Sequence, residues 1–140
     1  MRRSFVPWAA ALLLACAGAA GCEDVNPTDP SGPDPPPALT DTFTGTLNRN
    51  GAATFNFTVQ GAGSVTLVLT KVLPDNTVAV GLAIGTWNGI TCAIVLSNDN
   101  ALETTAVIGQ AGGVGQLCVR IYDVGKIEDR IDFELSVVHP

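Results

Sequence analysis

Hydrophobic and polar residues alternate with a period of two along most of the chain beyond residue 40. In residues 53–60, for example, Phe55, Phe57 and Val59 alternate with polar side chains. The same alternation recurs in residues 64–71, 77–85 and 130–138. A period of two is typical of β-strands that bury one face, and no long stretch has the 3.6-residue period of a helix.

Short polar and glycine-rich segments separate these runs, as expected for turns between strands. They lie at residues 50–51, 61–63, 74–76, 88–89, 97–100 and 112–113. The spacing predicts about eight strands over residues 40–140. An all-β fold follows, with a single antiparallel β-sandwich or jelly roll.

The beginning of the chain has a different pattern. An apolar block at residues 8–20 follows Arg2 and Arg3, which is the layout of a secretory signal peptide, and it is too short for a transmembrane helix of about 20 residues. Residues 19–22 resemble the lipobox of bacterial lipoproteins, in which the cysteine is lipidated and the preceding peptide is removed. The resemblance implies lipidation at Cys22. Cys16 is a rival site, because the lipobox favours leucine three places before the cysteine and Leu13 occupies that position. An ordinary secreted protein, cleaved nearby without lipidation, is a further alternative.

Residues 22–39 are rich in proline and aspartate, a composition that favours an extended tether rather than a packed core. The sequence thus predicts a signal peptide at 1–21, a lipidated cysteine with a linker at 22–39, and a folded domain at 40–140. After cleavage the chain would keep 5 basic and 13 acidic residues, a net charge of −8. Such an acidic chain is a poor partner for nucleic acid.

The folded part resembles the bacterial pre-peptidase C-terminal domain, a β-sandwich found on secreted proteins. The similar segments are residues 43–59, 82–90, 97–108 and 115–138. Residues 117–121 and 133–137 fit the two strands of that family's last hairpin. The chain departs from the family there, at Leu117, Cys118 and Phe133, and no protease domain precedes it.

Two cysteines remain for the folded part, Cys92 and Cys118. An exported chain meets an oxidising compartment, so we expect a disulfide between them. A metal site fits less well, because the chain has no second cysteine pair here and its one histidine, His139, is distant in sequence. The bridge would contribute roughly 3 kcal/mol.

Three sets of residues are candidates for ligand binding. Trp87 precedes the turn at residues 88–89 and is either an exposed anchor for a sugar or protein, or a cover over small residues of its own strand. Calcium prefers carboxylate and carbonyl oxygens, and some members of the family it resembles bind calcium. The calcium candidates are Asn98, Asp99 and Asn100, or Asp123, Glu128, Asp129 and Asp132. Asx turns and solvated hairpin charges are the alternatives for these residues.

Catalysis finds little support in the sequence, because no serine has a credible histidine partner. We therefore expect a lipid-anchored, exported, non-catalytic binding module at the cell envelope, without a cofactor other than calcium. Its partner would be an envelope or extracellular protein or a polysaccharide. The alternative is a structural accessory that stabilises or presents an envelope assembly without a ligand of its own.

Overall fold

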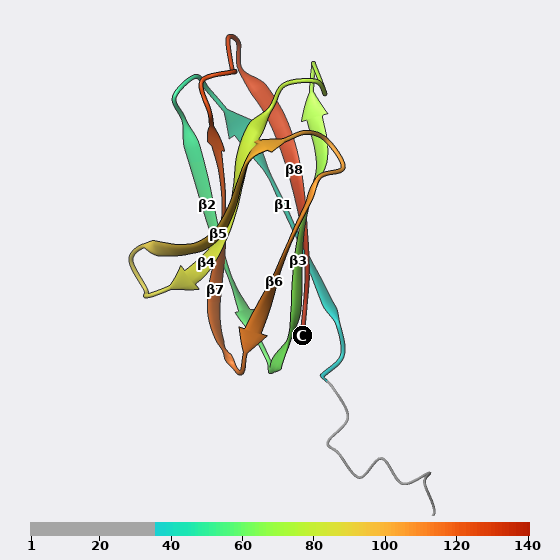
Figure 1. Cartoon of the computed structure of the whole chain (residues 1–140), viewed down its shortest axis with the longest axis vertical. Coiled ribbons are helices and arrows are strands. Elements are labelled where there is room, and N and C mark those ends of the chain that lie inside the picture. Colours follow the sequence, from blue (N-terminus) through green and yellow to red (C-terminus); the bar gives the residue numbers. More distant parts are fainter. Residues whose placement is uncertain (1–35) are drawn as a thin grey trace, which may run out of the picture. The chain divides into compact units, whose positions relative to one another are not determined.

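The structure is a computed structural model that describes residues 36–140, and the predicted signal peptide, Cys16 and Cys22 lie outside the described residues. Eight strands and no helix occur in the described part (Figure 1). None of its residues forms a helix long and apolar enough to cross a bilayer. The strands are β1 Leu39–Leu47, β2 Ala52–Val59, β3 Ala62–Leu73, β4 Val80–Trp87, β5 Cys92–Ala101, β6 Ala106–Gly112, β7 Gly115–Asp123 and β8 Ile131–His139.

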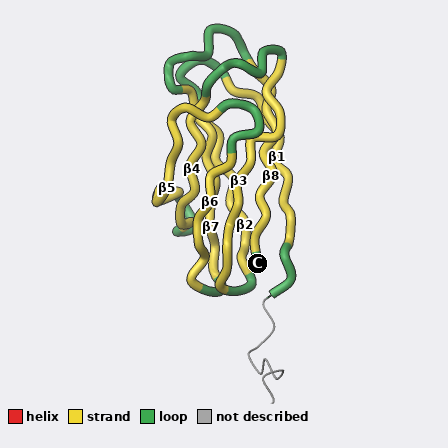
Figure 2. Tube along the Cα trace, turned by 45° about the vertical axis from the view of Figure 1, so that its right-hand side comes forward, coloured by secondary structure: helices red, strands yellow, loops and turns green. Residues whose placement is uncertain are grey.

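The strands form two four-stranded antiparallel sheets that pack face to face, which confirms the predicted all-β sandwich (Figure 2). One sheet has the order β1-β8-β3-β6 and the other has the order β2-β7-β4-β5. The two sheets therefore have their free edges at β1 and β2 on one side of the sandwich, and at β5 and β6 on the other.

The core lies between the sheets and is built from the alternating apolar positions. In β2, Phe57 and Val59 are buried while Asn56 and Thr58 are exposed. Leu67 and Leu69 of β3 and Leu135 of β8 are fully buried in the same cluster. The period of two thus places one face of each of these strands in the core, where burial of apolar area stabilises the fold.

The two sides of the sandwich are closed differently. On the side of β1 and β2, the rings of Phe43 and Phe55 stack with centroids 4.8 Å apart, and Phe133 meets Phe55 edge-on at 6.2 Å. These aromatic rings join the two sheets along that side. No aromatic ring is present in β5 or β6, and that side contains the apolar surface described below.

The turn predicted at residues 97–100 is wrong, because β5 continues through this polar stretch to Ala101. The segment stays paired with β4, where Asn98 lies opposite Leu82 and Ala101 lies opposite Val80. The pairing is irregular between these two pairs, so the strand keeps a local hydrogen bond from the Asn100 N–H to Asn98 Oδ1, 2.9 Å long. A contact that usually marks a turn is accommodated here by a bulge.

Candidate functional site

The turn between β4 and β5 is held by a network around Asn88. Its side-chain oxygen accepts hydrogen bonds from the backbone N–H groups of Ile90 at 2.9 Å and Thr91 at 2.8 Å, and its amide donates to Thr91 Oγ1 at 3.1 Å. Gly89 has a φ of +95°, which an L side chain rarely adopts. The turn therefore has a defined shape, and it holds Ile90 in solvent with 84% of its surface exposed.

The predicted disulfide is confirmed, and it ties this hairpin to the sheet. Cys92 of β5 lies opposite Trp87 of β4, and Cys118 of β7 lies opposite Gly85 of β4. The bridge therefore reaches from β5 to β7 across the intervening strand, with a Cα–Cα distance of 5.8 Å. Two strands on either side of a third are normally almost twice the 4.7–4.9 Å strand spacing apart, so β5 must fold over β4 at this point.

Gly85 permits that crossing. A Cβ atom at this position would lie 2.3 Å from the carbonyl oxygen of Ala93 and 3.0 Å from the Cα of Ile94. The backbone of β5 thus passes directly over the face of Gly85 where any other residue has a side chain. The pairing of β4 with β5 shifts register at the same place, between Ile84 and Gly85.

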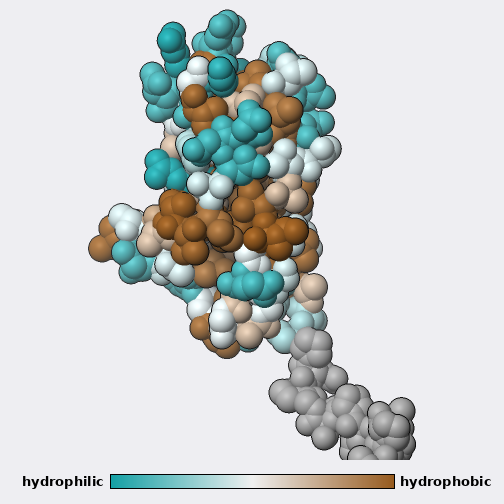
Figure 3. All heavy atoms as spheres, viewed as in Figure 1, coloured by the Kyte–Doolittle hydropathy of each residue, from teal (hydrophilic) through white to brown (hydrophobic). Residues whose placement is uncertain are grey.

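The crossing leaves β5 with apolar side chains that the sandwich does not cover. The exposed fractions are 44% for Ile94, 68% for Val95 and 40% for Leu96. Together with Ile90 we call these residues the hairpin surface. Figure 3 shows hydrophobic atoms gathered across the middle of the molecule, over β4, β5 and β6. Ile94, Val95 and Leu96 are consecutive along β5, and Ile90 lies apart from them in the turn. Exposed apolar surface of this kind is typical of interaction sites.

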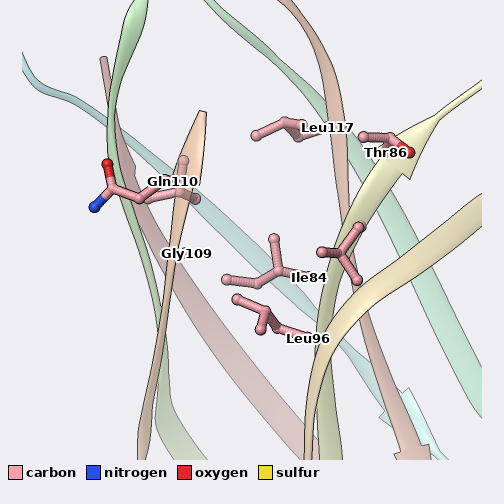
Figure 4. A pocket seen from close by; sticks show the side chains of 9 residues that line it. Ile84, Thr86, Leu96, Gly109, Gln110 and Leu117 are labelled. Carbon is pink, nitrogen blue, oxygen red and sulfur yellow. The ribbon is translucent and has the colours of Figure 1, made fainter. Parts of the chain in front are cut away.

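A small cleft opens beside the hairpin surface, between the edges of β5 and β6 (Figure 4). Its volume is about 70 Å³, and it is mostly apolar, with Ile84, Leu96 and Leu117 on its walls. On the β6 side stands Gly109, where an added Cβ would lie 3.2 Å from the Leu96 side chain. Because Gly109 has no side chain, there is room for the Leu96 side chain between the edges of the two sheets.

Trp87 lies at the base of the hairpin and is half-buried. The indole is therefore not a fully exposed anchor. The two glycines of its strand have other neighbours: the nearest atoms to Gly81 belong to the Tyr122 ring, and those nearest to Gly85 belong to the β5 backbone.

The calcium candidates are dispersed, and several of them have protein partners. Asp99 accepts a hydrogen bond from the Tyr122 hydroxyl, and Asp132 accepts one from Thr46 at 2.9 Å. Glu128 and Asp129 line a hollow of about 260 Å³ at the loops that precede β4 and β8. Within residues 36–140, no group of three His, Cys, Asp or Glu side chains is placed so that it could hold a metal ion.

Asp123 organises the loop between β7 and β8. Its carboxylate accepts hydrogen bonds from the backbone N–H groups of Gly125 at 2.8 Å, Lys126 at 2.9 Å and Ile127 at 3.1 Å, and from Asn50 at 2.8 Å. Desolvation alone would raise the pKa of Asp123, but these four donors hold it below its ordinary value. The residue therefore has a structural role that joins two loops.

Tyr122 and Arg120 form the wall of a second, shallow hollow of about 300 Å³ on the outer face of the β4–β7 pair, with Ile94 on its rim. The Arg120 guanidinium carbon lies 5.9 Å from the centre of the Tyr122 ring. Burial raises the pKa of the Tyr122 phenol, and its hydrogen bond to Asp99 raises it further. The tyrosine is therefore a neutral hydrogen-bond donor at physiological pH.

His139 has a role that the sequence did not suggest. It belongs to β8 and is 2% exposed, with its ring 4.9 Å from that of Phe57. Its Nε2 atom lies 3.1 Å from the Asp41 carboxylate and its Nδ1 atom lies 3.2 Å from the carbonyl oxygen of Pro140. Both ring nitrogens have protein partners, so this histidine is a packing residue at one end of the sandwich.

None of the ligand-binding candidates predicted from the sequence belongs to the hairpin surface. The available signal was the run at residues 92–96, which is apolar at every position and so has no polar face. Comparison with protein-family models gives no match for this chain, and comparison with curated proteins gives none either.

Proposed function

We propose that the chain is a lipid-anchored, exported β-sandwich that acts as a non-catalytic interaction module at the bacterial cell envelope. In this proposal Cys22 carries the lipid, residues 23–39 form a tether, and the sandwich contacts a partner protein through the hairpin surface. The domain would be a divergent relative of the pre-peptidase C-terminal domain.

The observation that carries the proposal is the exposure of the hairpin surface on a rigid support. Four exposed apolar residues on one hairpin, three of them consecutive, exceed the scattered single residues that ordinary surfaces contain. The disulfide and the Asn88 network hold these side chains outward. A preorganised apolar surface loses little conformational entropy when it binds, which favours association.

A protein partner fits this surface better than a polysaccharide. Sugar-binding sites combine a flat aromatic ring with hydrogen-bonding groups, whereas the exposed side chains here are branched aliphatic ones. The adjacent cleft of about 70 Å³ is also mostly apolar. Protruding aliphatic side chains beside a small apolar cleft are typical of the central part of a protein–protein interface.

A non-catalytic role is supported by the position of His139. This is the one histidine of the chain, and it is buried with both nitrogens engaged by Asp41 and Pro140. It is therefore unavailable as a general base for an external substrate.

The test of the binding part uses two matched variants. Val95→Asp places a charge in the hairpin surface at a position that is 68% exposed, and Val114→Asp makes the same change in the β6–β7 turn at a position that is 75% exposed. Neither side chain is buried, so both variants should fold. In chemical cross-linking on intact cells that express the full chain, Val95→Asp should lose the cross-linked partner band and Val114→Asp should keep it. Equal bands from both variants would refute the hairpin surface as the binding site.

The anchor is tested separately by mass spectrometry of the mature N-terminal peptide. The expected product is a diacylglycerol-modified Cys22 followed by Glu23. A lipid on Cys16 would move the anchor to the rival site, and an unmodified N-terminus beyond residue 22 would refute anchoring.

A further inference from the structure

The free edge of β6 lacks the features that normally protect an edge strand. An edge strand presents unpaired backbone N–H and C=O groups, and proteins usually guard it with charged residues, proline or a bulge. The β6 sequence, AVIGQAG, contains no charged residue and no proline. Its pairing with β3 is regular from Ala106 to Gly112, without a register shift.

The other three edges of the described sheets are less open to pairing. β1 carries Asp41, and β5 carries Asp99 and has two register irregularities against β4. β2 is uncharged, but the outward side chains in its middle are all polar, namely Thr54, Asn56 and Thr58, whereas β6 has one polar outward side chain, Gln110. On β6 the outward position at the middle of the strand is Ile108, with 63% of its surface exposed.

The ladder between β3 and β6 shows which backbone groups of β6 are free. The Leu69 N–H donates to the Thr105 carbonyl at 3.1 Å, and the Leu69 carbonyl accepts from the Thr104 N–H at 2.8 Å, so both backbone groups of Leu69 point toward the chain that enters β6. Antiparallel pairs alternate, so Val107, Gly109 and Ala111 direct their backbone groups toward β3. Ile108 and Gln110 therefore direct theirs away from the sheet, along with Ala106 and Gly112.

The surface beside this edge is uncharged as well. Residues 62–68 of β3, which pair with β6, contain no ionisable side chain. Ile108 lies opposite Thr66, which in turn lies opposite the half-exposed Val138 of β8. The chain as a whole has a formal charge of −6. Two copies of such an acidic protein repel each other least where they meet through an uncharged strip.

We propose that two copies of this chain associate through β6, by antiparallel pairing across a two-fold axis at Gly109. Gly109 is the middle residue of the strand, so this register pairs the strand along its full length. Ile108 of each copy then lies opposite Gln110 of the other, and both residues have the free backbone groups that the pairing requires. The two Gly109 residues face each other without side chains, and the two sheets become one continuous sheet of an isologous dimer.

A second copy satisfies this edge better than an unrelated strand does, because one surface supplies both halves of the contact. The same uncharged strip, the same free groups and the same central glycine occur on each side of the axis. The proposal goes beyond the interaction function above, since it requires neither the lipid anchor nor the envelope partner.

The test uses the purified polypeptide of residues 33–140, whose described part, residues 36–140, contains the complete core and the disulfide. Sedimentation equilibrium should show a monomer–dimer equilibrium. Amide hydrogen exchange should show protection at Ile108 and Gln110 that increases with protein concentration. Protein that stays monomeric up to about 1 mM would overturn the proposal.

Two substitutions in β6 are designed to prevent its pairing with a second copy. A third substitution introduces the same charge elsewhere on the surface and serves as the control. Ile108→Lys places a charge on the strip and should weaken the dimer at least about tenfold. Ile90→Lys makes the same change on the distant hairpin tip, where the residue is 84% exposed, and should leave the dimer as in the wild type. Gln110→Pro removes a backbone N–H that β3 does not use, so it should also abolish pairing. Circular dichroism identifies a variant that fails to fold, and the other edge variant then decides the result.

Two results would contradict the proposal, one by placing the dimer contact on another surface and the other by giving the β6 edge a different partner. A dimer that persists in both edge variants, with protection on the hairpin surface instead, would overturn the β6 pairing. A wild type that is monomeric alone, but whose Ile108 and Gln110 amides become protected on adding envelope extract, would assign the edge to a foreign strand. The second result does not bear on the cross-linking test of the hairpin surface. The first result does, because it would make a second copy of the chain the occupant of that surface.

Discussion

Replacing Gly85 by alanine tests whether the β5 backbone really crosses over β4. The new methyl carbon would lie 2.3 Å from the Ala93 carbonyl oxygen, about 1 Å closer than an ordinary contact. The atom it meets belongs to the backbone, so no side-chain rotation relieves the contact. The bridge between Cys92 and Cys118 also prevents β5 from swinging away.

The expected magnitude follows from these two constraints. Overpacking typically costs about 1–3 kcal/mol, and a contact with tethered backbone belongs at the upper end. The unfolded chain loses conformational freedom when glycine becomes alanine, which offsets about 0.4–1 kcal/mol. We therefore expect Gly85→Ala to lower the free energy of unfolding by about 2 kcal/mol.

Gly112→Ala is the matched control. A Cβ at Gly112 would meet no atom within 4 Å, and its φ is not positive. The same change there should be neutral or stabilise the fold by about 0.5 kcal/mol. Urea unfolding of residues 33–140 with the disulfide intact should separate the two midpoints by about 1–2 M. Midpoints that agree within about 0.3 M would refute the crossing.

Three further predictions concern the disulfide, the tryptophan and the loop aspartate. Replacing both Cys92 and Cys118 by serine should lower the free energy of unfolding by about 3.5 kcal/mol for a separation of 26 residues, measured by calorimetry; a loss under about 1 kcal/mol would contradict the entropic argument. Trp87→Ala should cost about 1–2 kcal/mol in urea unfolding, less than the 3–5 kcal/mol of a fully buried aromatic, because the indole is half-buried; a larger loss would place it in the core. The pKa of Asp123 is lowered in the folded state, so the stability it contributes is present above the unfolded pKa of 3.8 and lost as the pH falls through the folded pKa. Asp123→Asn should therefore be clearly less stable than the wild type at about pH 7 but nearly equal to it at about pH 2, and equal deficits at both values would contradict this role.

The sequence was sufficient for the parts of the fold that depend on local pattern. Alternation over residues 53–60 correctly placed Phe57 and Val59 in the core, and the turn at residues 88–89 formed where Asn88 and Gly89 predicted it. These features depend on the period of a strand and on the chemistry of two neighbouring residues. The pairing of Cys92 with Cys118 was expected from two points: these are the two cysteines of the folded part, and the predicted export brings them to an oxidising compartment.

Features that depend on distant contacts could not be read in this way. The polar stretch at residues 97–100 looked like a turn, but Asp99 gains a partner in Tyr122, which is 23 positions away, and the strand continues. The buried His139 has its Nε2 partner in Asp41, which is 98 positions away. A pattern of neighbours contains no information about such pairs.

The hairpin surface shows the limit most clearly. A run that is apolar at every position, such as residues 92–96, is typical of a strand buried on both faces in the middle of a sheet. The structure instead places it at an edge, because the disulfide and the side-chain-free face of Gly85 draw β5 over β4. The pattern alone cannot distinguish these positions, since both require apolar residues and differ only in what covers them.

The position of the disulfide connects the fold to the proposed function. A bridge that served stability alone could join any two strands, but this one fastens the strand that carries the exposed aliphatic side chains. Val95 and Leu96 line the cleft but are 68% and 40% exposed. Without the bridge, β5 could shift on the sandwich and bury more of the apolar area of these two side chains, as the hydrophobic effect favours. With it, the backbone is fixed and that area stays in solvent. The covalent constraint therefore maintains a surface that burial alone would remove, which is the property that an interaction module needs before its partner arrives.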